Sequence, residues 1–153
     1  MIKLILPAEV KKLLSDKELF GRISDDSITY DDFYPPNNTY LGIYHDDNLA
    51  GFWWLIPDNN ITVDVHCNVL KDYRKHSKKF AKEFADYMIT NHEGQIFKLI
   101  CKIPEGFDDV YHFTKNSGFV DEGIDRLSIM KNGKILNRRI LGITMQELKT
   151  WAQ

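Results

Sequence analysis

The chain has 153 residues, which is about the length of one domain. It carries 20 Lys and Arg against 22 Asp and Glu, a formal net charge of −2, so it is not a uniformly basic protein that coats nucleic acid. Hydrophobic residues make up 43% and aromatic residues 12% of the chain, which excludes a mainly disordered protein. The longest apolar run, 49–57, is far shorter than the roughly 20 residues that span a bilayer, so we expect no membrane association.

The N-terminal apolar stretch is too short for the core of a secretory signal, and no small-residue cleavage pattern follows it. We therefore expect a cytoplasmic protein. Cys67 and Cys101 lie 34 residues apart inside apolar runs and form no Cys-x-x-Cys pattern. They are interpreted as small buried hydrophobic residues rather than as a disulfide or metal ligands, and no metal site is expected.

The first half of the chain predicts two helices and then three strands. Pro7 begins a helical pattern, and a second short helix is predicted over 17–23. The segment 31–39 contains Pro35 and Pro36 and is predicted to be an irregular loop. Apolar and aromatic runs separated by turn residues predict an antiparallel meander of three strands, at 40–44, 49–56 and 61–70.

The second half predicts alternating helices and strands. The spacing of apolar residues over 74–89 is that of one helix face. A buried strand at 96–103 and a helix at 107–116 follow, the helix ending near Gly118. The sequence Asn132-Gly133 between apolar runs is a strong hairpin pattern, which predicts strands at 124–130 and 135–143 before a last helix at 145–151. Together these elements predict a mixed α+β layer architecture.

A run of cations crosses the junction between the third strand and the main helix. It contains one acidic residue, Asp72, and six basic residues: Lys71, Arg74, Lys75, Lys78, Lys79 and Lys82. A helix N-terminus with cations and free backbone N–H groups is suited to binding an anion such as phosphate. The alternative is a solvated helix face on which the lysine stems cover apolar surface.

The segment Val69–Arg74, between a strand and an amphipathic helix, resembles the acetyl-CoA signature of the GNAT N-acetyltransferase superfamily. The strand 96–103 and the helix ending at Gly118-Phe119 resemble the second signature of that superfamily. The resemblance is closest to a bacteriophage-encoded branch of GNAT-like proteins, through Ile23–Asp26, Asp64–His66 and Glu122-Gly123. It implies a GNAT-like fold over residues 1–153 as a single domain, with a mixed central sheet of about six to seven strands flanked by helices.

The resemblance also implies binding residues for acetyl-CoA. The strand backbone at Cys67, Asn68 and Val69 would hold the pantetheine. The loop would hold the pyrophosphate, through Arg74, Lys75, His76, Ser77, Lys78 and Lys79.

Two departures from the superfamily pattern concern these positions. Ser77 and Lys79 stand where the superfamily has glycines, which let the backbone approach the pyrophosphate. Thr114 stands where the superfamily often has a tyrosine that acts as general acid, and Phe107 stands where it has an asparagine. Tyr111, one helical turn from Thr114, is the candidate replacement for the acid.

Asp64 and His66 are the candidate general base. Strand alternation places both on one face, and a histidine beside a carboxylate suits proton removal from an amine. The alternative is the ordinary polar face of a half-buried strand. The acidic residues of 25–32, with their aromatic neighbours, lie where GNAT folds wall the acceptor site. They indicate either a wall for a cationic amine or a capping and turn region.

Three functions are consistent with the sequence. The first is an enzyme that transfers acetyl from acetyl-CoA to an unknown amine, on a small molecule or a protein. The second is a catalytically degenerate phage protein of the same fold that acts in virion or head assembly, or binds a host partner, and so is virion-associated. The third, ranked last, is a nucleic-acid or host-protein binder that uses the basic helix start.

Overall fold

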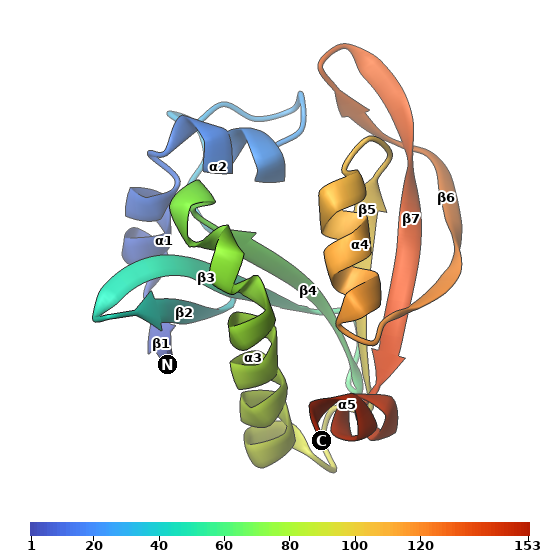
Figure 1. Ribbon diagram of the computed structural model, residues 1–153. Helices are drawn as coiled ribbons and strands as arrows, with labels where there is room; N and C mark the ends of the chain where they lie inside the picture. The colour runs from blue at the N-terminus through green and yellow to red at the C-terminus, as the bar shows by residue number, and fades with distance from the viewer.

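Seven strands form one mixed sheet that helices cover on both faces (Figure 1). The computed structural model describes all residues, 1–153. The strands are β1 (Ile2–Ile5), β2 (Thr39–His45), β3 (Asn48–Pro57), β4 (Thr62–Val69), β5 (Lys98–Pro104), β6 (Val120–Lys131) and β7 (Lys134–Thr144). The helices are α1 (Pro7–Leu13), α2 (Lys17–Ile23), the 3₁₀ helix η1 (Lys71–His76), α3 (Ser77–His92), α4 (Asp108–Asn116) and α5 (Met145–Ala152). None of the helices combines the length and the apolar character that a membrane crossing would need.

The strand order is β1-β2-β3-β4-β5-β7-β6. All neighbouring strands are antiparallel except β4 and β5, which are parallel. The predicted α+β architecture, the three-stranded meander and the C-terminal hairpin are therefore confirmed, and the sheet has the upper number of strands expected.

Two elements differ from the sequence expectation. The first is β1, for which no strand was predicted; it is a four-residue edge strand whose pairing with β2 cannot be inferred from local sequence. The second is the helix predicted over 74–89. The chain turns as a 3₁₀ helix up to His76, and α3 begins only at Ser77. Side-chain hydrogen bonds fix this turn: Arg74 Nε donates to the carbonyl of Val69, and Ser77 Oγ donates to the carbonyl of Arg74.

The two faces of the sheet form separate hydrophobic clusters because alternate strand residues point to opposite sides. In β3, Trp53 packs with the cluster beneath α3 and α5, and its ring stacks on Phe84 with centroids 4.1 Å apart. Its neighbour Phe52 packs with Tyr40 and the helices α1 and α2. In β5, Cys101 and Ile103 face α4. The sheet therefore has α1 and α2 on one face, and α3, α4 and α5 on the other (Figure 1).

The parallel pair β4–β5 is short. Only Thr62–Asp64 of β4 pair with Lys98–Ile100 of β5. Beyond these pairs β4 stays with β3 as far as Val69, and β5 stays with β7 as far as Pro104. Figure 1 shows the two strands separating in this direction. The sheet is thus continuous at one end of these strands and open at the other.

We expect Gly51→Ala to lower the free energy of unfolding by about 3 kcal/mol, the upper part of the range for overpacking. Gly51 lies opposite Val69, and a Cβ there would come within 2.2 Å of the carbonyl oxygen of Asn68. This atom is strand backbone, so it cannot rotate away. Urea denaturation measures the effect.

The control for this variant is Gly21→Ala in α2, where a Cβ meets nothing within 4 Å. We expect that substitution to stabilise the protein by about 0.5–1 kcal/mol, since alanine restricts the unfolded chain. Equal effects of the two substitutions would contradict the tight packing of β3 against β4.

Candidate active site

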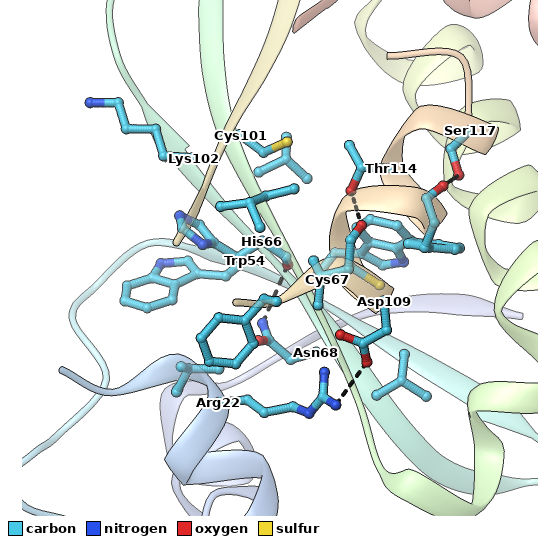
Figure 2. A pocket seen from close by; sticks show the side chains of 18 of the residues that line it. Arg22, Trp54, His66, Cys67, Asn68, Cys101, Lys102, Asp109, Thr114 and Ser117 are labelled. Atoms are coloured by element: carbon cyan, nitrogen blue, oxygen red, sulfur yellow. Dashed lines mark hydrogen bonds and ion pairs between the residues drawn. The ribbon is translucent and has the colours of Figure 1, made fainter. Parts of the chain in front are cut away.

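A cleft of about 530 Å³ passes through the open end of the sheet, between the separated ends of β4 and β5. Its lining is mostly hydrophobic, and α2, α3, α4 and the β6–β7 hairpin contribute to its walls. Figure 2 shows His66 and Trp54 on one side of the strands and Thr114 and Ser117 of α4 on the other. The size and lining are typical of a small-molecule site.

His66 stands at this opening beside Asp64, on the face of the sheet that α1 and α2 cover. Nε2 of His66 lies 3.3 Å from Oδ1 of Asp64. The His66 side chain is 37% exposed and lines the cleft, whereas the Asp64 oxygen is buried and has no hydrogen bond. The contact is therefore electrostatic, and it places a carboxylate behind the imidazole. Trp54, paired with His66 across the strands, lies against it with ring centroids 5.7 Å apart.

The predicted pantetheine residues Cys67, Asn68 and Val69 form the β4 side of the opening and line the cleft. Their strand has no partner on the β5 side there, because the β4–β5 ladder ends at Asp64. Asn68 is only 5% exposed, and its Nδ2 donates to the carbonyl of His66 at 3.3 Å. A strand edge without a neighbour is suited to pairing with an extended amide chain.

A chain of ion pairs, which we call the α2 latch, ties α2 to η1 and α4. Glu18 of α2 accepts two hydrogen bonds from Arg74, at 2.8 and 2.5 Å, and one from Arg22 at 2.9 Å. Arg22 also donates to Asp109 of α4 at 2.8 Å, a contact drawn in Figure 2. The Arg74 hydrogen bonds lower the pKa of Glu18 to about 2, and Arg22 lowers the pKa of Asp109. Arg74, a predicted phosphate ligand, is thus already bound to a carboxylate.

The first turn of α3 carries the rest of the predicted phosphate loop. It has no side-chain N-cap and no acidic residue. Ser77 lines the cleft, whereas the other predicted ligands lie outside its lining: Lys75, His76, Lys78 and Lys79. His76 stacks on His45 with ring centroids 4.1 Å apart, and desolvation together with His45 lowers the pKa of His76. The lysines at the start of α3, which continues directly from η1, make the surface beside Ser77 positively charged.

The two cysteines are both in the cleft wall. Cys101 is buried, as expected, but Cys67 is only half-buried, because the opening between the strands exposes it. Desolvation raises the pKa of Cys67, and it raises the pKa of Cys101 to about 12. Both groups are therefore neutral thiols at pH 7, and neither is an activated nucleophile.

Helix α4 contributes hydroxyls that are already engaged. Oγ1 of Thr114 donates to the carbonyl of Val110 at 2.8 Å, and Oγ of Ser117 donates to that of Phe113 at 2.9 Å. Tyr111 is not brought to the cleft: its hydroxyl donates to Asp121 at 2.6 Å, and its ring lies beneath Arg139. The structure therefore separates Tyr111 from the other two predicted catalytic residues, Asp64 and His66.

Three of the four predicted acceptor-wall acids lie outside the cleft. Asp25 lines it, with its carboxylate accepting hydrogen bonds from the backbone and hydroxyl of Ser27. Asp26 binds the hairpin turn by accepting from the N–H groups of Asn132 and Gly133, at 2.7 Å each. Asp31 and Asp32 are exposed. The region is mainly a turn and capping region, which was the alternative interpretation.

The β6–β7 hairpin turn contacts the end of α2 beside the cleft. Lys131 is only 7% exposed, and its ammonium donates to the carbonyls of Gly21 and Ser24 at the end of α2. A cation is favourable at a helix C-terminus, where the carbonyls lack partners. Together with Asp26, Lys131 joins residues 21–26 to the β6–β7 turn, and we call this contact the roof.

Solved structures with the same architecture include spermidine N-acetyltransferases. The spermidine N-acetyltransferase from Vibrio cholerae in complex with CoA and spermine matches with a TM-score of 0.79 and 13% identity, over 97% of this chain and 97% of that chain. A chimeric form of that enzyme matches with a TM-score of 0.80 and 12% identity, over 97% of both chains. The fold is therefore the GNAT fold.

The sequence itself defines a narrower group. Residues 2–112 match a family described as a protein of unknown function, DUF2824. The chain belongs to this family. The search of curated proteins gave no match.

Several residues of the site were not found from the sequence. Glu18, Arg22 and Asp109 form the latch, but the only local pattern there is the i, i+4 spacing of Glu18 and Arg22. Lys131 directly precedes the predicted hairpin turn Asn132-Gly133, and no local pattern indicates its contact with α2. Both sets act over long sequence distances, which a single sequence does not reveal.

We expect the α2 latch to stabilise the folded state at neutral pH and to lose this contribution at acid pH. The pKa of Glu18 is lowered from 4.5 to about 2, so its ion pairs stabilise the folded state above about pH 4.5 and are lost as the pH falls towards 2. Glu18→Gln should therefore be less stable than the wild type at pH 7, with a difference that shrinks between pH 4.5 and 2. Denaturant melts across this range measure it.

Asp31→Asn is the matched control, since Asp31 is exposed and makes no ion pair or hydrogen bond. A difference between wild type and Glu18→Gln that stays constant with pH would contradict the assigned role of Glu18.

Proposed function

We propose that this protein is an N-acetyltransferase that uses acetyl-CoA as donor and an amine as acceptor. The observation that carries the proposal is the opening between β4 and β5, with His66 at its edge and Asp64 behind it. The GNAT fold, shared with enzymes that transfer acetyl groups to spermidine, supports this choice of reaction.

The chain offers suitable surroundings for acetyl-CoA at two places. The unpaired edge of β4 at Cys67–Val69 would hold the amide-containing pantetheine by strand-like hydrogen bonds. Ser77 and the uncapped first turn of α3, with Lys75, Lys78 and Lys79 nearby, would hold the pyrophosphate. Bound there, acetyl-CoA supplies an acetyl group already activated as a thioester.

Arg74 is already paired with a carboxylate where it would meet the phosphates. Three of its five N–H donors are engaged, two by Glu18 and one by the carbonyl of Val69. A phosphate that replaces the carboxylate would keep the charge pairing but release Glu18 from η1. Binding of the donor would then compete with the α2 latch.

His66 would act as general base. The contact of Nε2 with Asp64 favours the tautomer that carries its proton on Nε2, which leaves Nδ1 as the basic nitrogen. Nδ1 would accept the proton that the acceptor ammonium must lose before its nitrogen can attack a carbonyl carbon. Asp64 would then stabilise the imidazolium. As the nitrogen bonds to the acetyl carbon, the C–S bond of the thioester would break and CoA would leave as a thiolate. Because Thr114 and Tyr111 are both engaged elsewhere, the proposed chemistry uses no general acid from α4, and the thiolate takes its proton from water.

We expect acetyl-CoA to raise the melting temperature of the wild type, and Arg74→Ala with Lys79→Glu to abolish most of the increase. Ligand at about 100 times its dissociation constant adds about 2.7 kcal/mol of stability, which is several degrees for a domain of this size. Thermal-shift titration with acetyl-CoA, with ATP and phosphate as comparison ligands, measures it.

The control for this pair of substitutions is Lys12→Glu, which makes the same charge change as Lys79→Glu on the exposed face of α1. A shift in the wild type that is equal for acetyl-CoA, ATP and phosphate would contradict a specific donor site.

Glu18→Gln should bind acetyl-CoA more tightly than the wild type, since it frees Arg74.

We expect His66→Gln to lower the rate of acetyl transfer by roughly 100-fold to 10,000-fold, the usual contribution of a general base. The affinity for acetyl-CoA should stay unchanged, because the base does not hold the donor. His112→Gln, a change at an exposed histidine of α4 outside the cleft, is the control. An unchanged rate in His66→Gln, followed as release of free CoA thiol, would contradict this role.

A second candidate function follows from the pairing of Arg74 with Glu18 and from Ser77 and Lys79 at the glycine positions. These features favour a GNAT-fold protein that has lost acetyl-CoA binding and acts in phage virion or head assembly, or binds a host protein. Its expected behaviour is the absence of any shift with millimolar acetyl-CoA, together with co-purification with phage particles. A specific acetyl-CoA shift, or absence of the protein from purified particles, would contradict it.

A further inference from the structure

The acceptor side of the cleft is rich in cations although the whole chain has a net charge of −2. Besides His66, the charged residues that line the complete cleft are five cations and two carboxylates: Arg22, Arg74, Lys102, Lys131, Arg138, Asp25 and Asp109. Arg22, Arg74 and Asp109 belong to the α2 latch. On the acceptor side this leaves Lys102, Lys131 and Arg138 against Asp25, whose carboxylate accepts hydrogen bonds from Ser27. Behind the lining, Asp125 pairs with Arg138 and Asp64 lies beside His66.

Lys102 differs from the other cations because it has no partner. Arg138 donates to Asp125 at 3.0 Å and to Ser128 at 2.9 Å, and Lys131 donates to backbone carbonyls. No hydrogen bond or ion pair involves the ammonium of Lys102, and the residue, half-buried as a whole, lines the cleft. A cation without a counter-ion in a cleft lining is free to pair with an anion there.

The strand register places Lys102 between His66 and Arg138. Lys102 lies opposite Ile140, and Arg138 lies opposite Pro104, so the two cations are diagonal neighbours on the same face of the β5–β7 pair. Such neighbours have Cα atoms roughly 7–8 Å apart, within reach of one carboxylate for long side chains. Figure 2 shows Lys102 on the same side of the strands as His66 and Trp54, with its ammonium directed away from His66.

The roof limits the size of a ligand on the acceptor side of the cleft. Lys131 and Asp26 join the end of α2 to the hairpin turn directly beside the lining residues Ser24, Asp25 and Ile129. A folded protein surface would have to displace this contact, whereas a small molecule would not. The acceptor side therefore favours a small amine.

We propose that the acceptor is a small amine that carries a carboxylate close to its amino group, as an amino acid does, with Lys102 and Arg138 binding the carboxylate while His66 faces the amine. This inference rests on the proposed acetyl transfer. It also distinguishes this chain from the spermidine N-acetyltransferases that share its fold, because a polyamine would meet like charges here.

The test is an acetyl-transfer assay with matched acceptors: amino acids, the corresponding amino acid amides, and spermidine. The wild type should use carboxylates at least about tenfold better than their amides, a ratio equivalent to about 1.4 kcal/mol. Lys102→Gln should abolish this preference by raising KM for the carboxylates. Lys102→Glu should favour the amides and spermidine. Lys134→Gln, at an exposed position of the hairpin outside the cleft lining, should match the wild type.

Binding of the same acceptors, followed by saturation-transfer NMR, separates this inference from the proposed function. Transfer to spermidine and amides at rates equal to those of the carboxylates would overturn the inference and leave the acetyltransferase assignment standing. If no amine is acetylated, the proposed function fails. In that case carboxylate-selective binding that disappears in Lys102→Gln would still support the anion subsite, and absence of such binding would overturn it.

Discussion

The site depends on one constraint, the early end of the pairing between β4 and β5. Three residue pairs hold the two strands parallel, and then each strand follows its other neighbour. A fully paired sheet would leave only its two faces accessible, whereas this separation connects them through the cleft. It exposes the side of Cys67, frees the edge of β4 and lets His66 and Thr114 line one cavity from opposite faces. Every role proposed for an individual residue follows from its position relative to this opening.

Much of this arrangement could be predicted from the sequence, and the reasons are local. Apolar periodicity located the main helix and the meander strands, and Asn132-Gly133 located the hairpin. The pair Asp64 and His66 was found because residues two apart on a strand share a face. The position of Tyr111 was not, because helical spacing relates it to Thr114 but does not show which groups its side chain meets: Asp121 and Arg139 hold that side chain on the outside of α4.

The larger difference concerns charge. From the sequence, the cations between 71 and 82 indicated either an anion site or a solvated helix face, and the acids between 25 and 32 indicated either a wall for a cationic amine or a capping and turn region. In the structure several of these charges have protein partners. Glu18, which shows no motif, binds Arg74, and Asp26 binds a backbone turn. Lys102, unremarkable in its strand, becomes the unpartnered cation of the cleft. Charge in a sequence is a local property, but the pairing of charges is a property of the fold.

The roof has a consequence for the order in which the protein folds. Its hydrogen bonds join residues more than 100 positions apart, as between Lys131 and Ser24. Closing a loop of that length costs about 4 kcal/mol of chain entropy, so such contacts form once the intervening structure has already shortened the path. The meander, α3 and β5 lie between these two segments and can assemble first. The acceptor side of the cleft is then the last part of the molecule to take shape, and during synthesis it stays open until the C-terminal hairpin has been made.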